Sequence, residues 1–480
     1  MSDVFNIELK LDKDFIAALE KLKVKYGEIF ERLNGFHNNN LDFTDFIDNF
    51  VDSATVADAS IDSNSNSNTK DIRTLMSDMM KPHTKLLSFN KIFYEHKKKY
   101  GLEAAEKWLE EEYNGCFYMH DAASVSLMPY CFAYDLDGLV EKGLYFINNF
   151  KSRAAKHLTT FNDHVLEFIS WTSNRTSGAV GLPSYLVYSW WFWWKDVQNG
   201  FYLKDPEYYR RQCFQKFCYD LNQPYLRVSE CAFTNISIMD RPYLEEIFGG
   251  RIFPDGTMAI DHIEEILEHQ KVFMEVVAEI RKECMMTFPV LTYSLLYKDG
   301  KFVDEEFARW CSKHNLLWMD SNFFVSGDVT SLSSCCRLRN GIEDNTFSYT
   351  LGAGGIETGS KGVITLNLNR IVQDWTRESE EELPLYITAI VNRVHKYLTA
   401  FNEIIWDSKN AGLLTIGING FVEGAEYLGI PIDADSAEYQ LYAKDILETI
   451  KNLNIAARTD RCKFNTEFVP AESLGVKNAK

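Results

Sequence analysis

Two adjacent cysteines, Cys335 and Cys336, are the residues of this 480-residue chain whose types and spacing point most directly to chemistry. Consecutive Cα atoms lie about 3.8 Å apart across a trans peptide, below the roughly 4.4–6.8 Å of an unstrained disulfide. A structural disulfide between the two is therefore disfavoured, and Arg337 can help to stabilise a thiolate. The serine-rich flanks leave three chemistries open: a nucleophile, a redox partner or a radical.

Two glycine-rich segments are candidates for ligand-binding turns. The segment 354–362 has its glycines and lysine in the wrong order for a phosphate-binding loop of the Gly-x-x-x-x-Gly-Lys-Ser/Thr type, and we interpret it as a mobile loop. Gly417-Ile-Asn-Gly420 follows an apolar run and is typical of a strand-to-helix turn, with close backbone packing as the other interpretation. Neither segment indicates nucleotide binding by itself.

Ten cysteines and ten histidines raise the question of a metal site. The sequence contains no Cys-x-x-Cys pair, and Cys213 and Cys218 would point to different faces of a helix. His262 and His269 lie on one predicted helix, where we interpret them as solvent-facing polar residues. We therefore predict that this chain binds no zinc.

Composition limits the classes of partner. The net charge of −19 argues against a broad nucleic-acid surface, which needs positive charge to release counterions from phosphates. Small anionic ligands stay possible, because helix N-termini can hold phosphate groups on an acidic protein. The start of the chain does not resemble a secretory signal, so we expect a cytoplasmic protein whose cysteines are thiols.

The longest apolar stretch is 179–194, which contains Gly181 and Pro183 and is shorter than the roughly 18 residues that span a bilayer. We interpret it as an aromatic helix in the core and expect no membrane association.

The elements that must position the cysteines have an α/β pattern. Short β-rich runs at 289–297, 363–368 and 413–418 are separated by helical stretches, which predicts buried strands. An amphipathic helix is expected from Asp261 to about Glu283, with Asp261 and Glu264 in a capping pattern. Near the start of the chain, helical periodicity places four apolar residues on one face, namely Phe15, Leu19, Leu22 and Tyr26.

Several stretches together resemble anaerobic (class III) ribonucleotide reductase, an oxygen-sensitive glycyl-radical enzyme. The stretches that carry this resemblance are Tyr118-Met-His-Asp121, Tyr130-Cys131, Phe233-Thr-Asn-Ile-Ser237, Phe288-Pro-Val-Leu-Thr292, Ser334-Cys-Cys-Arg-Leu338, Val363-Ile-Thr-Leu-Asn-Leu368, Leu414-Thr-Ile-Gly-Ile-Asn-Gly420 and Phe464-Asn-Thr-Glu-Phe-Val-Pro-Ala-Glu-Ser473. Their order and their spread from about residue 60 onward favour membership of that family.

The resemblance implies a ten-stranded α/β barrel made of two antiparallel, five-stranded parallel halves, with a finger loop through its middle. We expect residues 60–480 to form this barrel and residues 1–59 to form an N-terminal helical extension that does not resemble an ATP-cone. The Asn- and Ser-rich segment 60–69 is either a linker or an ordered entry to the barrel.

The same resemblance implies roles for particular residues. Cys336 would carry the thiyl radical that abstracts the ribose 3′ hydrogen, with Cys335 as the second choice. Cys131 matches the second active-site cysteine, and Asn367 matches an amide that hydrogen-bonds the substrate. His120 is expected near the site, although a histidine that satisfies a neighbouring backbone group is the alternative. The residues expected to bind the substrate phosphates are Pro470, Ala471, Glu472 and Ser473.

The sequence departs from the family pattern in its radical source and its reductant. The glycyl-radical motif Arg-Val-x-Gly-Tyr and its paired zinc ligands are absent, so either the gene is split or the chain is truncated. We expect a separate polypeptide to bring the radical glycine and the zinc, and a radical S-adenosylmethionine activase to act on it. Ser334 stands where formate-using relatives have methionine, so a redoxin is as suitable a reductant as formate.

The leading hypothesis is the catalytic subunit of a split anaerobic ribonucleotide reductase that acts on ribonucleoside triphosphates, forms a homodimer and responds to ATP or deoxynucleotide effectors. On its own the chain should be inactive. Two other hypotheses stay open: a pyruvate formate-lyase-like acyltransferase, which also has two adjacent cysteines at its loop tip, and a non-catalytic, nucleotide-binding remnant. The source would be an anaerobic bacterium or a phage-infected host.

Overall fold

The structure is a computed structural model that describes residues 11–34, 72–120, 128–145, 151–223, 226, 231–284, 286–319, 321–329, 331–334, 338–341, 358–405, 412–433 and 435–468. Its strands are β1 Phe117–Met119, β2 Cys131–Ala133, β3 Val180–Gly181, β4 Thr234–Met239, β5 Val290–Lys298, β6 Lys301–Phe302, β7 Ser321–Ser326, β8 Ser331–Ser334, β9 Leu338–Gly341, β10 Thr358–Asn367, β11 Gly412–Asn419 and β12 Cys462–Phe468.

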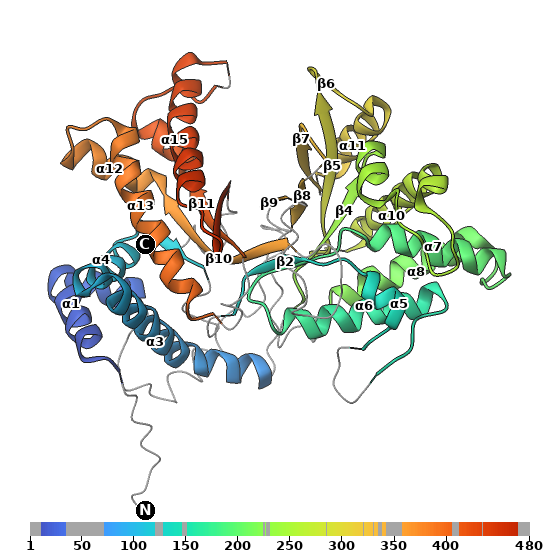
Figure 1. Cartoon of the computed structure of the whole chain (residues 1–480), viewed down its shortest axis with the longest axis horizontal. Coiled ribbons are helices and arrows are strands. Elements are labelled where there is room, and N and C mark those ends of the chain that lie inside the picture. The colour runs from blue at the N-terminus through green and yellow to red at the C-terminus, as the bar shows by residue number, and fades with distance from the viewer. Residues whose placement is uncertain are drawn as a thin grey trace, which may run out of the picture.

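The α-helices cover the outside of the strands (Figure 1). They are α1 Lys13–Asn34, α3 Ile72–Tyr100, α4 Leu102–Tyr113, α5 Asp137–Lys142, α6 Leu158–Ser173, α7 Tyr185–Gln198, α8 Pro206–Leu221, α9 Arg241–Tyr243, α10 Ile263–Glu283, α11 Glu305–Trp318, α12 Leu368–Glu378, α13 Leu383–Asn402, α14 Phe421–Tyr427 and α15 Ala437–Ala456. A π turn at Leu244–Phe248 and a 3₁₀ turn at Ala259–His262 complete the set.

Ten of the described strands form one mixed sheet, with the order β12-β11-β10-β2-β3-β4-β5-β6 and with β1 and β7 paired to β10 and β5. Strands β2, β3, β4, β5 and β7 are parallel to one another, and with their helices we call them the β2–β7 half. Strands β10, β11 and β12 are parallel as well, and with α1, α3, α4 and α12 to α15 they form the β10–β12 half. The halves meet where β2 pairs antiparallel with β10.

The sequence prediction of an α/β fold with buried strands is therefore confirmed. Among the described residues, hydrogen bonds form a ten-stranded sheet but do not join its β12 edge to β7, so they do not establish a closed barrel. A boundary at residue 59 or 60 lies outside the described residues, and α1 packs on α3 and α4 within the core of the β10–β12 half.

A separate two-stranded hairpin, β8–β9, lies between the two halves (Figure 1). Strand β8 approaches β2, β5 and β7, whereas β9 approaches β10 and β12. The three residues that connect the two strands in sequence are Cys335, Cys336 and Arg337. The hairpin therefore contacts both halves on either side of the cysteine pair.

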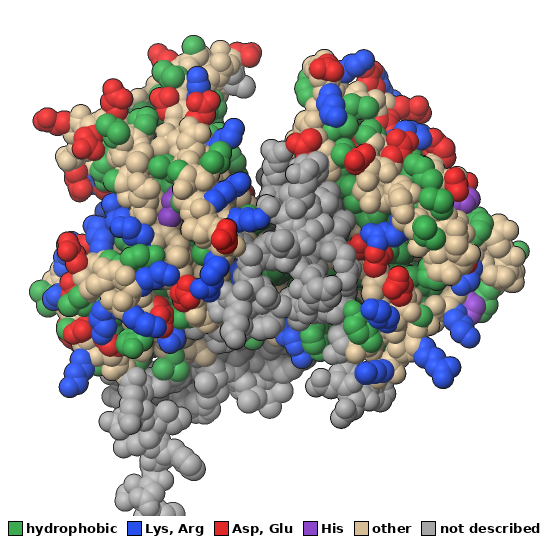
Figure 2. Space-filling model, viewed as in Figure 1, with side chains coloured by type: hydrophobic (Ala, Val, Ile, Leu, Met, Phe, Trp, Pro, Cys, Tyr) green, Lys and Arg blue, Asp and Glu red, His purple; other side chains and the backbone are tan. Residues whose placement is uncertain are grey.

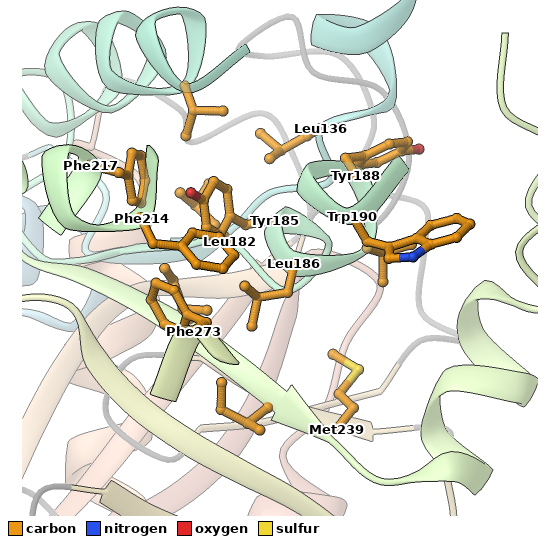
Figure 3. Packing of buried hydrophobic residues seen from close by; sticks show 14 of the residues in the cluster. Leu136, Leu182, Tyr185, Leu186, Tyr188, Trp190, Phe214, Phe217, Met239 and Phe273 are labelled. Atoms are coloured by element: carbon orange, nitrogen blue, oxygen red, sulfur yellow. The ribbon is translucent and has the colours of Figure 1, made fainter. Parts of the chain in front are cut away.

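The β2–β7 half has an aromatic core on the helix side of its strands (Figure 3). Tyr185 of α7 stacks on Phe217 of α8 with ring centroids 4.4 Å apart, and Phe214 meets Phe273 of α10 at 5.0 Å. Helix α7 is buried along most of its length, as the sequence predicted for 179–194. A search of the described residues finds no helix that is long and apolar enough to cross a membrane.

The core of the β10–β12 half holds a buried ionic group. Glu111 of α4 is 2% exposed and accepts hydrogen bonds from the Arg393 guanidinium and, at 2.8 Å, from the Tyr397 hydroxyl. Both partners come from α13, so the network ties α4 to the helix that covers β10 and β11. A buried carboxylate needs such partners, because burial without them would destabilise the charged form.

Helix α10 corrects two details of the sequence interpretation. Asp261 lies in the preceding 3₁₀ turn, the N-cap is His262, and no side chain caps the helix. His269 is not solvent-facing: it is fully buried, with Nε2 at 3.0 Å from the Ser189 hydroxyl. The rings of Trp193 on α7 and Phe214 on α8 lie 5.9 Å and 4.9 Å from the His269 ring. The periodicity of α10 alone does not show that these helices bury this face.

Candidate active site

Strand β10 gathers the candidate residues that the structure describes. Strands β1 and β2 pair with the same edge of β10, one after the other, so that residues 117–119 and 131–133 run along β10 in the opposite direction. The His120 amide donates to the Val363 carbonyl at 3.0 Å, and the Tyr130 amide donates to the Ser360 carbonyl at 3.1 Å. His120 and Cys131 are thereby brought to neighbouring positions along one strand.

Alternation along the strands decides which side chains face away from the helices. Ile364 and Leu366 belong to the core beneath α13, and a Cβ at Gly362 would meet the Phe401 ring of that helix at 2.6 Å. Val363 and Thr365 therefore lie on the opposite, inner face of β10. The apolar residues of a strand pack against helices, and its polar residues are left for the inner face.

Cys131 is 1% exposed and lies at the junction of the two halves, directly opposite Ser360 of β10. Its Sγ accepts a hydrogen bond from the Ala179 amide at 3.1 Å. It packs with Ala179, Tyr130 and Phe233 in a small cluster separate from the two large cores. Its position at the junction distinguishes it from the thiols that fill the helical cores.

Three of those other thiols are held in an inert form by burial. Burial raises the pKa of Cys116, Cys213 and Cys218 to about 12 in each case. A thiol reacts as its thiolate, so these cysteines carry no nucleophile near neutral pH. They are structural residues of α8 and of the segment before β1.

His120 is held against the inner face of β10. Its Nε2 lies 2.8 Å from the Thr365 hydroxyl, and its ring lies 4.8 Å from the Tyr118 ring and 5.8 Å from the Tyr130 ring. The contact with Thr365 fixes the ring orientation on the face that Cys131 also shares. A role for His120 in the site stays a prediction.

Asn367 lies at the other end of β10. Its Oδ1 caps α12 by accepting from the Arg370 amide at 3.2 Å, and its Nδ2 donates to the Gly115 carbonyl at 3.1 Å. Residues 360 and 367 are roughly 23 Å apart along a strand that rises about 3.3 Å per residue. The structure thus brings His120 and Cys131 together but leaves Asn367 at the strand end, where it begins a helix.

Ser360 is a site residue that sequence reasoning missed, because segment 354–362 was interpreted as a loop while β10 begins at Thr358. Its Oγ lies 2.8 Å from Thr415 Oγ1, and Thr415 Oγ1 donates to Asn465 Oδ1 at 2.7 Å. These three side chains form a polar row across β10, β11 and β12. The Asn465 Nδ2 is buried without a hydrogen-bond partner. The alternation of polar residues at 463, 465 and 467 is the sequence signal that could have indicated a polar face on β12.

Charged groups also line this part of the sheet. Lys361 is 1% exposed and lies at a β-bulge between Ser360 and Gly362, where the register with β11 shifts. Glu467 of β12 is 6% exposed and pairs in register with Gly417. Such groups could bind a polar, charged ligand.

The inner face of the β2–β7 half is small and polar. Asn235 Nδ2 donates to the Val290 carbonyl and to the Thr292 hydroxyl, both at 3.0 Å. The hydroxyls of Ser237 and Ser294 are buried and have no hydrogen-bond partner. Both halves therefore present hydrogen-bonding groups toward the side opposite their helices.

The remaining predicted residues, Cys335, Cys336 and Pro470–Ser473, lie outside the described residues. Among the residues that are described, no group of three histidine, cysteine or carboxylate side chains is arranged to hold a metal ion. The strand-to-helix turn predicted at Gly417–Gly420 is present, with Gly420 at φ 70° before α14.

The fold is shared with solved anaerobic ribonucleotide reductases. A crystal structure of the anaerobic ribonucleotide reductase from Thermotoga maritima in complex with dATP and CTP is 35% identical, with a TM-score of 0.82 over 99% of this chain and 79% of that chain. A second, with dATP in the specificity site, is 34% identical with a TM-score of 0.82 over 99% and 80%. A third, with citrate in the active site, is 34% identical with a TM-score of 0.81 over 99% and 86%.

The chain belongs to the anaerobic ribonucleoside-triphosphate reductase family, also called class III. The family model described as anaerobic ribonucleoside-triphosphate reductase matches residues 77–413, which is more than half of the chain. Among curated proteins, none matches.

Proposed function

We propose that this chain is the catalytic subunit of an anaerobic ribonucleotide reductase and reduces ribonucleoside triphosphates to deoxyribonucleoside triphosphates by thiyl-radical chemistry. The observation that carries the proposal is the placement of Cys131 opposite Ser360, where the two halves meet. Hairpin β8–β9, whose connecting residues are Cys335, Cys336 and Arg337, approaches both halves beside this junction.

In the proposed mechanism, the Cys336 thiyl radical takes the ribose 3′ hydrogen, and the 2′ hydroxyl takes up a proton and leaves as water. Cys131 donates a hydrogen atom to C2′, and Cys336 finally returns its hydrogen to C3′, which restores the thiyl radical. The two electrons come from a redoxin or from formate. The polar row that begins at Ser360, with His120 beside it, is suited to hold sugar hydroxyls. Pro470–Ser473 are proposed to bind the substrate phosphates, and Asn367 and Cys335 remain candidates for substrate contact and for the radical.

We propose further that the ten strands close into a barrel around the hairpin. The support is the arrangement of its two strands, since β8 approaches β7 at one edge of the sheet and β9 approaches β12 at the other. An enclosed interior would keep water and oxygen from a radical, which suits this chemistry.

The radical source is proposed to be a glycine on a separate polypeptide, which would also hold the structural zinc and be activated by a radical S-adenosylmethionine enzyme. A longer form of this chain that carries the glycine is the alternative, since residues 1–480 contain neither Arg-Val-x-Gly-Tyr nor a Cys-x-x-Cys pair. The relatives from Thermotoga maritima bind dATP and CTP, so a cytidine triphosphate substrate, a dATP-type effector and a homodimer are proposed here as well. The family match favours reduction over pyruvate formate-lyase-like acyl transfer or a non-catalytic remnant.

The test is an anoxic assay of deoxynucleotide formation with the chain, a candidate glycine-bearing polypeptide and its activase. We expect a glycyl EPR signal and turnover with the natural chain, and loss of turnover with Cys336→Ser or Cys131→Ser. Cys284→Ser is the matched control, because Cys284 is exposed at the end of α10. Full turnover in either active-site variant, or no deoxynucleotide with any glycine-bearing partner, would overturn the proposal.

A further inference from the structure

The sulfur of Cys131 lies against Gly178 and Ala179, the two residues that precede β3. A Cβ added at Gly178 would lie 2.3 Å from Cys131 Sγ and 2.9 Å from the Tyr130 carbonyl oxygen. Real Cβ atoms do not approach sulfur so closely. Glycine is therefore the residue that allows the sulfur to occupy this place.

The hydrogen-bond ladder between β2 and β3 changes at the same point. The Phe132 amide donates to the Ala179 carbonyl at 3.0 Å and the Tyr134 amide donates to the Gly181 carbonyl at 2.8 Å, as in a regular parallel pair. The Ala179 amide donates to Cys131 Sγ at 3.1 Å instead of to a carbonyl of β2. A main-chain donor of the sheet is thus used to hold a side-chain thiol.

A second glycine allows the strand on the other side to come close. A Cβ at Gly359 of β10 would lie 2.1 Å from the Cys131 carbonyl oxygen and 2.7 Å from Phe132 Cα. The backbone of Cys131 is therefore closely flanked by both neighbouring strands, and its sulfur lies on the side of Gly178 and Ala179.

We infer that the Gly178–Ala179 step is a positioning element for the Cys131 thiol, whose sulfur it holds in place through the Ala179 amide. The inference rests on the proposed function only for its meaning in turnover. A hydrogen bond to the charged form of an acid favours that form, and an amide donor at the sulfur acts in this way on a thiolate.

The test is a pH titration of thiolate absorbance in the full chain, from which the contribution of Cys131 is obtained by subtracting the Cys131→Ser variant in each background. In Gly178→Ala the added methyl displaces the sulfur from the Ala179 amide. We expect the midpoint of Cys131 ionisation to rise by at least about one pH unit, which is about tenfold less thiolate at a given pH. An unchanged midpoint would overturn the inference.

Two glycine variants are the matched controls and should keep the natural midpoint. Gly181 lies in β3, and a Cβ there would meet Ala133 of β2 at 3.3 Å without approaching the sulfur. A Cβ at Gly250 would meet nothing within 4 Å. A shift as large in Gly181→Ala would show that crowding of β3, not contact with the sulfur, is the cause, and would also overturn the inference.

A double-mutant cycle keeps the inference testable if Gly178→Ala is too unstable to titrate. In the Cys131→Ala background the sulfur is gone, so Gly178→Ala should cost clearly less unfolding free energy than in the natural chain. An equal cost in both backgrounds would contradict the inference. Absence of turnover with the predicted shift intact would count against the proposed function alone, whereas turnover with an unshifted midpoint would count against the positioning role alone.

Discussion

The two halves of the sheet stabilise their helices in different ways. The β2–β7 half buries stacked aromatic side chains, such as Tyr185 on Phe217, between α7, α8 and α10. The β10–β12 half has a core of aliphatic and aromatic side chains that is crossed by the Glu111 network, and its α3 buries His96 against Trp108. Yet both halves direct small or polar side chains to the opposite face. The strand face toward the helices therefore carries the apolar core, and the opposite face carries the hydrogen-bonding groups.

The largest expected effect breaks the aromatic core of the β2–β7 half. Phe217 is 1% exposed and stacks on Tyr185, so Phe217→Ala should lower the free energy of unfolding by about 4 kcal/mol through lost burial and a cavity. Denaturant unfolding measures the loss. Tyr202→Ala, at a residue that is 40% exposed, is the control and should change stability little. Equal effects of the two variants would contradict this role of the core.

The β10–β12 half should be sensitive to acid. His96 is fully buried with no hydrogen-bond partner at either ring nitrogen, and burial lowers its pKa to about 3. Because the unfolded chain binds a proton that the folded chain rejects, stability should fall as pH falls from about 6.5 toward 3, by up to about 4 kcal/mol. Denaturant unfolding at several pH values should show a smaller pH dependence for His96→Leu. An unchanged slope would refute this assignment.

The β2–β7 half should show the opposite dependence. Burial raises the pKa of Asp240 to about 6, against the lowering effect of the Leu296 and Tyr243 amides that donate to its carboxylate. The folded chain then binds a proton that the unfolded chain has released, so this group loses about 3 kcal/mol of stability as pH rises from about 4 to 6.

Asp240→Asn removes the titratable group but keeps one acceptor oxygen for the two amides, because its Nδ2 cannot accept. The variant should be less stable at every pH, and this part of its stability profile should be flatter in the same unfolding experiment. A steeper profile in the variant would show that the carboxylate is ionised in the fold and would remove the contrast between the halves.

The smallest expected effect concerns the inner face. Thr415→Val removes the hydroxyl that links Ser360 to Asn465 but keeps the shape of the side chain. We expect about 1 kcal/mol less stability in thermal or denaturant unfolding, the usual net value of one hydrogen bond. In an active complex, the same variant should raise KM for the nucleotide more than it lowers kcat. An effect as large as that of Phe217→Ala would mean that the inner face is part of the stabilising core.

Much of the fold could be predicted from the sequence because its strands are buried runs of apolar residues. The runs at 289–297 and 413–418 correspond closely to β5 and β11, and the aromatic stretch after Ala179 leads into α7. The antiparallel joint between β2 and β10 could not be predicted in this way, because it pairs strands that are only three and ten residues long and far apart in sequence.

Sequence reasoning named candidate site residues that have a reactive or titratable side chain. It did not name residues that join the candidate site only through their position in the sheet. Cys131 and His120 were named from the family resemblance, and their roles stay predictions. Ser360 was missed, since glycines on either side of it suggested a loop, and its importance comes only from its register with Cys131. Asn367 matched a motif, yet local geometry uses it to cap α12.

The antiparallel joint has a consequence for the order of assembly. Residue 131 is synthesised long before residue 360, and contacts between such distant segments form late because the intervening chain must first be brought together. The aromatic core of the β2–β7 half can therefore fold in a nascent chain before β10 is available to pair with β2 beside Cys131. The surroundings of Cys131 therefore become complete only after β10 has been synthesised, more than 200 residues after the cysteine itself.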